Sequence, residues 1–164
     1  MKGKIIVLTG DGKGKTTSAF GCALRAAGHD KRVVVIQFMK ARESGETMIK
    51  VKNIEVFKFG RNFVFKAGKE DFEIAEKAMN FAREEIKKKP FLLILDEINV
   101  AIDKNLIKLE DVIKLLNERE ETNIILTGRN AKKEIIEIAD IVTEMKNIKH
   151  YYEKTGETIE GIEW

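Results

Sequence analysis

The chain has 164 residues, and its 30 Lys and Arg against 27 Asp and Glu give a formal net charge of +3. This length fits one domain with a substantial core, and the near balance of charge argues against a protein that binds nucleic acid or a membrane surface. No apolar run approaches the roughly 20 residues of a membrane span, no signal peptide precedes the first apolar run, and the single Cys22 excludes an internal disulfide, so we expect one cytoplasmic domain spanning residues 1–164.

The first predicted element is a buried parallel strand over Ile5–Leu8, an apolar run between turn residues. A glycine-rich loop follows it and leads, through Lys15 and Thr16, into a helix over residues 15–28. This is the order of a phosphate-binding loop, in which backbone N–H groups and the positive end of the helix face anionic oxygens. We expect Lys15 to reach the terminal phosphates and the Thr16 hydroxyl to ligate Mg²⁺. The predicted nucleotide-binding residues of this loop are Gly10, Asp11, Gly12, Lys13, Gly14, Lys15, Thr16 and Thr17.

The loop departs at one position from the pattern G-x-x-x-x-G-K-[ST]. The first glycine of that pattern would fall at Thr9, but it stands one place later, at Gly10, and Lys13 adds a second positive charge inside the loop. The alternative is an ordinary glycine-rich turn between a strand and a helix. The order of the neighbouring elements favours the phosphate-binding interpretation.

Two further strands are predicted, over residues 32–38 and 54–59. Ligands of open α/β sheets bind beyond the carboxyl ends of the strands, so the polar loop after the first of these two strands is either a wall of the site or an ordinary surface loop. Phe63 and Phe65 lie two apart in the loop after the second. They either fasten this loop to the domain or form an aromatic wall for a flat ligand.

A second chemical element follows a long amphipathic helix predicted over residues 70–88. An apolar strand that begins at Phe91 ends in the acidic pair Asp96 and Glu97. A carboxylate in this position would hold Mg²⁺ beside Thr16. The acidic pair alone is a moderate signal, and together with the upstream loop it predicts a Mg²⁺–nucleotide site.

The rest of the chain continues the alternation, with a helix predicted over 109–117, a strand over 122–126, a helix over 131–139 and a strand over 141–145. Arg129 follows the carboxyl end of a strand, where it is placed to meet a phosphate or another anion. His150 is a candidate ligand or base, but no Cys or second His nearby supports a metal site. The alternation predicts an α/β domain of the P-loop NTPase-like (RecA-like) type, with a mainly parallel sheet and helices on both faces.

These motifs specify a triphosphate and Mg²⁺ but leave three reaction classes open. The classes are hydrolysis, phosphoryl transfer, and attack on the sugar with triphosphate as the leaving group. Glu97 is the candidate for activating a water, which keeps hydrolysis among them.

Several longer blocks follow one another over nearly the whole chain. They are Gly-Asp-Gly-Lys-Gly-Lys-Thr-Thr-Ser-Ala-Phe-Gly-Cys-Ala-Leu-Arg-Ala (10–26), Val-Ile-Gln-Phe-Met-Lys (35–40) with Gly45-Glu46, Leu-Asp-Glu-Ile-Asn (95–99), Thr-Gly-Arg (127–129), Ala-Asp-Ile-Val-Thr-Glu-Met (139–145), Lys149-His150 and Gly-Ile-Glu (161–163). Together they resemble the P-loop type of ATP:cob(I)alamin (corrinoid) adenosyltransferase. The later blocks are more specific to that family than the phosphate loop by itself.

The resemblance implies an enzyme of cobalamin biosynthesis, with ATP as co-substrate and Mg²⁺ as cofactor. The Co(I) of a reduced corrinoid would attack C5′ of ATP, and triphosphate would leave. The resemblance implies that Lys15, Thr16 and Glu97 are catalytic and stabilise the leaving group. Thr16 and Glu97 match the family's Mg²⁺ contacts. Asp96 is added to them because it stands at the end of the same apolar strand. Arg25 matches an arginine near the nucleotide.

In the loop after the third predicted strand, Phe63-Val64-Phe65 stands where the family has Phe-Thr-Trp. The resemblance therefore assigns Phe63 and Phe65 to corrinoid binding, although Phe65 lacks an indole N–H. The family often has a segment before the first strand that helps cover the corrinoid, whereas only Met1 to Lys4 precede the strand here.

The resemblance also implies partners. They are cob(I)alamin or a cobinamide-type corrinoid, an electron donor such as a reduced flavoprotein, and a second copy of the chain in a homodimer, with no nucleic acid or membrane partner. Two alternatives stay open from the residues alone: a RecA-like Mg-dependent ATPase, and a non-catalytic carrier of ATP or a corrinoid.

Overall fold

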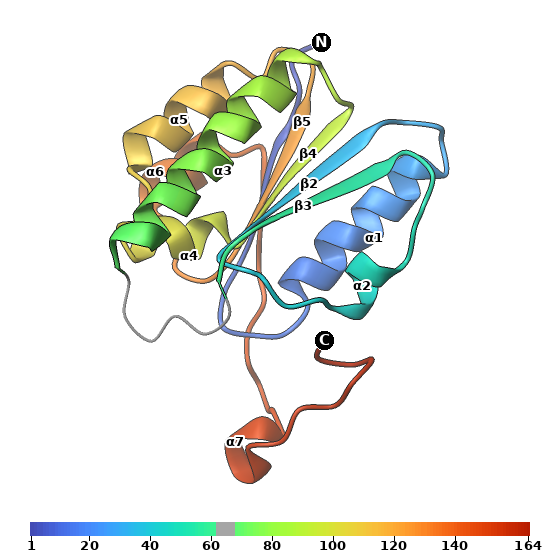
Figure 1. Ribbon diagram of the computed structural model, residues 1–164, viewed down its shortest axis with the longest axis vertical. Helices are drawn as coiled ribbons and strands as arrows, with labels where there is room; N and C mark the ends of the chain where they lie inside the picture. Colours follow the sequence, from blue (N-terminus) through green and yellow to red (C-terminus); the bar gives the residue numbers. More distant parts are fainter. Residues whose placement is uncertain (62–67) are drawn as a thin grey trace.

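The computed structural model describes residues 1–61 and 68–164, and Figure 1 shows a central sheet with helices on both faces. The strands are β1 (Ile5–Thr9), β2 (Val33–Phe38), β3 (Ile54–Phe59), β4 (Leu92–Asp96), β5 (Asn123–Thr127) and β6 (Ile141–Glu144). The helices are α1 (Lys15–Ala27), α2 (Gly45–Met48), α3 (Lys69–Lys87), α4 (Ile98–Asp103), α5 (Leu109–Asn117), α6 (Lys133–Ile138) and α7 (Tyr152–Thr155).

The sheet has the strand order β3-β2-β4-β5-β1-β6, and all of its strand pairs are parallel. The carboxyl ends of all these strands therefore lie at one edge. Strand β5 separates β1, which leads into the glycine-rich loop, from β4, which ends in Asp96. Helix α1 covers one face, and α3 and α5 lie on the other (Figure 1). This confirms the predicted α/β fold of the P-loop NTPase-like type.

The apolar strands are explained by burial on both faces of the sheet, as expected for a parallel sheet. Val33 and Val35 of β2 pack into the cluster that includes Ala19 and Phe20 of α1. Their neighbour Val34 points the other way, into the larger cluster under α3 and α5. The central strands are therefore held firmly from both sides, which fixes the positions of the loops that follow them.

The long elements lie within about two residues of their predicted bounds, whereas the short helices α2, α4 and α7 were not predicted. The loop expected after β2, around Gly45, contains helix α2. This helix spans four residues, which is too short to show a 3.6-residue period. The Ser44 N–H donates to the Thr47 hydroxyl at 3.2 Å, and the Thr47 N–H donates to the Ser44 carbonyl at 2.8 Å, which closes this turn locally.

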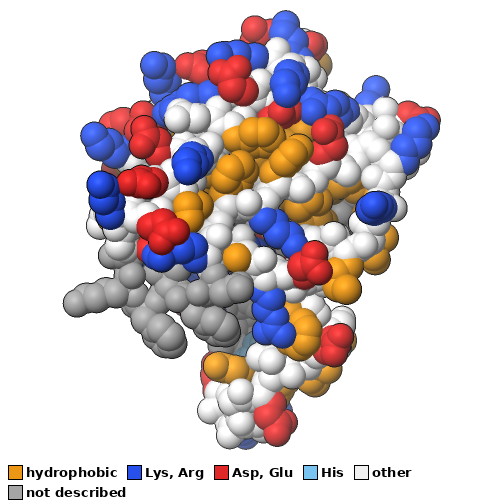
Figure 2. All heavy atoms as spheres, in the orientation of Figure 1, with side chains coloured by type: hydrophobic (Ala, Val, Ile, Leu, Met, Phe, Trp, Pro, Cys, Tyr) orange, Lys and Arg blue, Asp and Glu red, His pale blue; other side chains and the backbone are white. Residues whose placement is uncertain are grey.

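The surface mixes charges of both signs. Figure 2 shows blue and red side chains interspersed over the visible face, without an extended field of one sign, in keeping with the formal net charge of +3. Among the described residues, no helix combines the length and the apolar character that crossing a bilayer requires.

Candidate nucleotide and metal site

A cavity of about 840 Å³ lies at the carboxyl edge of the sheet. Its walls are the glycine-rich loop and the start of α1 (residues 13–17), the segment after β2 (residues 39–46), Glu97 after β4, and the end of the chain (residues 161–164). The segment after β2 thus lines this cavity, and its role as a wall of a ligand site stays a prediction. Open α/β sheets bind ligands at this edge.

The glycines of the loop are required by its backbone. Gly10 and Gly14 have φ values of 96° and 111°, a region that side chains rarely tolerate. Gly12 donates its N–H to the carbonyl of Met145 at 2.7 Å, and a Cβ on Gly12 would lie 2.7 Å from the carbonyl oxygen of Lys146. The segment after β6 therefore braces the loop from outside.

Lys15 begins helix α1 and folds its side chain back over the loop, where its Nζ donates to the Gly12 carbonyl at 2.6 Å. Burial lowers the pKa of Lys15 below its ordinary value; the Glu97 carboxylate opposes this shift and the Arg129 charge adds to it. The ammonium is thus held at the mouth of a loop whose N–H groups suit an anion.

Asp96 is the centre of a buried polar group that we call the Asp96 cluster. Its carboxylate is fully buried. Oδ1 accepts hydrogen bonds from the Thr16 hydroxyl at 2.8 Å and the Thr127 hydroxyl at 2.7 Å. Oδ2 accepts from the Gln37 amide at 3.0 Å and from Lys40 Nζ at 2.7 Å. The four donors come from α1, β2, the segment after β2, and β5, so the cluster ties the site to the centre of the sheet.

Glu97 stands at the turn between β4 and α4, with a φ of 64°. Its N–H donates to the Thr127 hydroxyl at 2.9 Å, which fixes this strained turn. Burial, and next the charge of Asp96, raise the pKa of Glu97 above its ordinary value. The charges of Lys40 and Lys15 oppose that shift. Glu97 lines the same cavity as Thr16.

The oxygen atoms of Thr16 and Glu97 are donors of the kind that fit a magnesium ion. The described residues contain no group of three or more His, Cys, Asp and Glu that could hold a metal. Mg²⁺ is commonly bound by one or two carboxylates together with substrate phosphates. The Thr16 hydroxyl, linked to Asp96, and the Glu97 carboxylate supply such a partial set next to the predicted phosphate loop.

A second acidic group, which we call the Glu163 cluster, closes the cavity from the chain end. Lys13 donates to the Ile162 carbonyl and lies 3.3 Å from Glu163 Oε2. The Tyr151 hydroxyl donates to Glu163 Oε1 at 2.9 Å, and His150 Nε2 lies 3.7 Å from the same oxygen. In Figure 1 the chain runs below the sheet after β6, forms α7, and returns with its end below the glycine-rich loop.

The last residue described, Trp164, lies against the segment after β2. The Arg42 guanidinium carbon is 3.8 Å from the centre of the Trp164 ring, a cation–π contact. The Trp164 indole N–H is buried and has no hydrogen-bond partner among residues 1–61 and 68–164. Neither Arg42 nor Trp164 was among the predicted site residues, because neither belongs to a periodic element.

The other predicted site residues divide into three groups. Arg129 lies near the loop, with its Nε 3.7 Å from Asp11 Oδ1. Arg25 lies exposed in the last turn of α1, ten residues beyond Lys15 and therefore about 15 Å along the helix, and it does not line the cavity. Phe63 and Phe65 lie outside the described residues.

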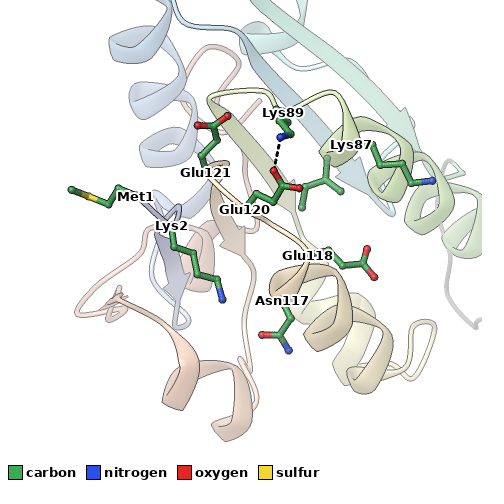
Figure 3. Close-up of a pocket in the computed structure, with 9 residues that line it drawn as sticks. Met1, Lys2, Lys87, Lys89, Asn117, Glu118, Glu120 and Glu121 are labelled. Atoms are coloured by element: carbon green, nitrogen blue, oxygen red, sulfur yellow. Dashed lines mark ion pairs between the residues drawn. The ribbon is translucent and has the colours of Figure 1, made fainter.

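A further hollow lies at the opposite edge of the sheet. Figure 3 shows it lined by side chains of both signs from the chain start and from the ends of α3 and α5, with the ion pair of Lys89 and Glu120 marked. It stands at the amino ends of the parallel strands, away from the carboxyl edge where such sheets bind ligands. We therefore place the candidate site at the glycine-rich loop.

Comparison with known proteins adds the chemical class. The family model described as ATP:corrinoid adenosyltransferase BtuR/CobO/CobP matches residues 1–164. A corrinoid adenosyltransferase of Sinorhizobium sp. is 38% identical over 173 residues, covering 99% of this chain and 81% of that protein. The corrinoid adenosyltransferases of Escherichia coli K12 and Salmonella typhimurium LT2 are 33% and 34% identical, each covering 99% of this chain and 86% of theirs.

Proposed function

The chain belongs to the ATP:corrinoid adenosyltransferase family, and from that premise we propose that its glycine-rich loop binds the triphosphate of the ATP that the enzyme uses. The enzyme is a transferase that moves the adenosyl group of ATP to a corrinoid. The observation that carries the placement is that Lys15, Thr16 and Glu97 all line one cavity, with the Thr16 hydroxyl bonded to the buried Asp96.

The residues have distinct roles in this proposal. The N–H groups of the loop and the Lys15 ammonium bind the triphosphate and stabilise its charge as it leaves. Thr16 and Glu97 would hold Mg²⁺, with Asp96 orienting the Thr16 hydroxyl; the ion would neutralise charge on the leaving triphosphate. Arg129 adds a further positive charge beside the loop.

The bond changes require no acid or base from the protein. The reduced Co(I) of the corrinoid donates its electron pair to C5′ of ATP, the C5′–O bond breaks, and its electrons leave with the triphosphate. No proton moves in this step. The chain therefore contributes by positioning the two substrates, excluding water and stabilising the leaving group.

The finer points of the proposal concern the corrinoid and the assembly. We assign the wall that contacts the corrinoid to Phe63 and Phe65. A partner such as a reduced flavoprotein would supply the electron that reduces the corrinoid cobalt, and the enzyme would act in the cytoplasm. A homodimer is supported by the edge strand β6, where Ile141 and Val142 are 51% and 42% exposed. Light scattering on the purified protein measures the oligomeric state directly.

The decisive experiment is an anaerobic assay with Mg-ATP and chemically reduced cobalamin. The corrinoid spectrum and the phosphate product are followed together. We expect a light-sensitive adenosyl-corrinoid and one triphosphate for each corrinoid converted. Release of ADP and phosphate without a corrinoid change would instead assign the site to a RecA-like ATPase, which the family membership does not favour.

The corrinoid wall is tested by Phe63→Ala. We expect slower turnover of the corrinoid with ATP binding nearly unchanged, because the wall contacts only one substrate. The matched control is Phe91→Ala, which removes a phenyl ring that is 44% exposed just before β4, at the opposite edge of the sheet. Equal losses of ATP affinity and corrinoid turnover in Phe63→Ala would refute the assignment.

A further inference from the structure

Lys40 is the cationic member of the Asp96 cluster, and a sharp turn of the chain holds it there. The chain turns sharply after β2 at Met39, whose φ is 59°. Gly60 packs against this turn so closely that a Cβ there would lie 2.4 Å from the Lys40 backbone nitrogen. A strained turn braced by a glycine persists only when its surroundings enforce it. Here it returns the Lys40 side chain to the end of β4.

The position of the Lys40 ammonium is close to the predicted metal contacts. Its Nζ lies 2.7 Å from Asp96 Oδ2 and 3.5 Å from the Thr16 hydroxyl oxygen. The Lys40 side chain is 30% exposed, whereas that of Asp96 is 0% exposed. The ammonium therefore reaches the buried carboxylate from the cavity side, and it has a route back into the cavity.

The electrostatics of this arrangement favour a cation beside Asp96. A carboxylate removed from water is strongly destabilised unless a positive charge or several donors compensate it. The two hydroxyls and the amide around Asp96 are neutral, so Lys40 supplies the positive charge. A dication bound at the Thr16 hydroxyl would supply the same compensation and would repel the ammonium beside it.

We propose that Lys40 is an exchangeable counter-ion: it neutralises Asp96 while the Thr16 position is empty of metal and leaves Asp96 when Mg²⁺ binds there. This inference rests on the proposed metal position at Thr16. Lys40 is then a positioning residue, which keeps the Thr16–Asp96 pair assembled before the substrate arrives. The displaced ammonium enters the cavity in which the triphosphate is proposed to lie.

The test compares Lys40→Met with wild type in the absence of nucleotide. The variant keeps an unbranched side chain one atom shorter and removes its charge, so the carboxylate lacks a counter-ion until metal binds. We expect a lowered thermal midpoint that Mg²⁺ alone restores, and Mn²⁺ binding, followed by electron paramagnetic resonance, at least tenfold tighter than in wild type. The matched control is Lys132→Met, which removes a surface ion pair of 2.7 Å to Asp103 and should give a midpoint that Mg²⁺ does not change.

A measurement on the wild-type protein keeps the proposal testable even if Lys40→Met fails to fold. With ¹⁵N-labelled lysine, the Lys40 ammonium should give a slowly exchanging resonance that shifts or broadens on addition of Mg-ATP. An unmoved Lys40 resonance, or equal metal affinity in wild type and Lys40→Met, would overturn the proposal and leave a fixed ion pair. Neither measurement involves a corrinoid, so a failed adenosylation assay would not change the metal affinity or the Lys40 resonance.

Discussion

Two acidic side chains lie at the same site, Asp96 buried behind the cavity and Glu163 on its wall, and they are held in opposite ways. Asp96 is 0% exposed and accepts hydrogen bonds from four donors that belong to α1, to strands of the sheet and to the segment after β2. Glu163 is 16% exposed and is held by residues of the chain end and by Lys13. Because a buried carboxylate cannot be left without partners whereas a rim carboxylate can exchange them for water, the Asp96 cluster is preorganised and the Glu163 cluster is displaceable.

The two lysines of the glycine-rich loop follow the same division. Lys15 is half-buried and turns inward to the Gly12 carbonyl, whereas Lys13 is exposed and turns outward to Glu163. In sequence they are two residues apart and chemically identical. The contrast between the clusters therefore predicts that Lys15 is indispensable for activity and that Lys13 is not.

The largest effect is expected for Lys15→Ala. Loss of a preorganised cation at the leaving group should lower kcat by about 10²–10³-fold, with the thermal midpoint nearly unchanged because a single hydrogen bond within the loop is lost. Steady-state rates with Mg-ATP and reduced corrinoid measure it. A decrease below tenfold would show that the inward lysine has no special role.

Asp96→Asn should have the next largest effect, because it breaks the buried cluster. The amide places a donor where Oδ1 or Oδ2 now accepts, so one of the surrounding donors loses its acceptor. We expect the free energy of unfolding to fall by roughly 1–3 kcal/mol and activity to fall by about 10–100-fold. Denaturant titration and initial rates measure the two effects.

The control for this variant is Asp103→Asn, at an acidic residue whose partners Lys132 and Asn130 lie at the surface. Its effect on stability should stay within about 1 kcal/mol. Equal losses of stability in the two variants would contradict the difference between buried and rim carboxylates.

Lys13→Ala should change the affinity for ATP by less than about fivefold, the size of an exposed ion pair. The variant lacks a positive charge that would contact the triphosphate. It also has no Lys13–Glu163 ion pair to break before ATP binds. Glu163→Gln should tighten ATP binding by a similar factor, because it weakens the competing contact. Calorimetric titration of both variants checks this, and a loss in Lys13→Ala as large as in Lys15→Ala would refute it.

The sequence predicted the parts of the site that depend on chain order. The glycine-rich loop, the acidic end of β4 and the parallel sheet follow from alternation and from motif spacing. Thr16 and Asp96 are 80 residues apart in sequence, and the structure brings them within 2.8 Å. The metal-binding roles of Thr16, Asp96 and Glu97, and the nucleotide-binding role of Arg129, stay predictions.

The parts that were missed depend on which strands are neighbours and on aperiodic segments. Gln37 and Thr127 reach Asp96 because β2 and β5 flank β4, an order that a single sequence does not specify. Lys40 reaches it through a turn with positive φ at a methionine, which has no sequence signature. The end of the chain carries neither a 3.6-residue nor a two-residue period, so the contact of Trp164 with Arg42 could not be anticipated.

The smallest effect concerns the pH dependence of the Glu163 cluster. Burial raises the pKa of Glu163, but the hydrogen bonds from Tyr151 and Lys13, with the charges of Lys13 and His150, outweigh it and hold the pKa below the ordinary value of 4.5. A depressed pKa means that the contact contributes stability above pH 4.5 and loses it as the pH falls through the lowered value.

Trp164 reports this release, because it is the only tryptophan in the chain and its indole N–H is buried. On acidification below pH 4.5 we expect its emission to move to longer wavelength while the far-UV circular dichroism still shows a folded domain. In Glu163→Gln the Trp164 emission should already lie at the longer wavelength at neutral pH, and it should not change as the pH falls below 4.5. An emission change that coincides with loss of the dichroism signal would mean that the chain end unfolds only with the whole domain, and the Glu163 cluster would then be as integral to the fold as the Asp96 cluster.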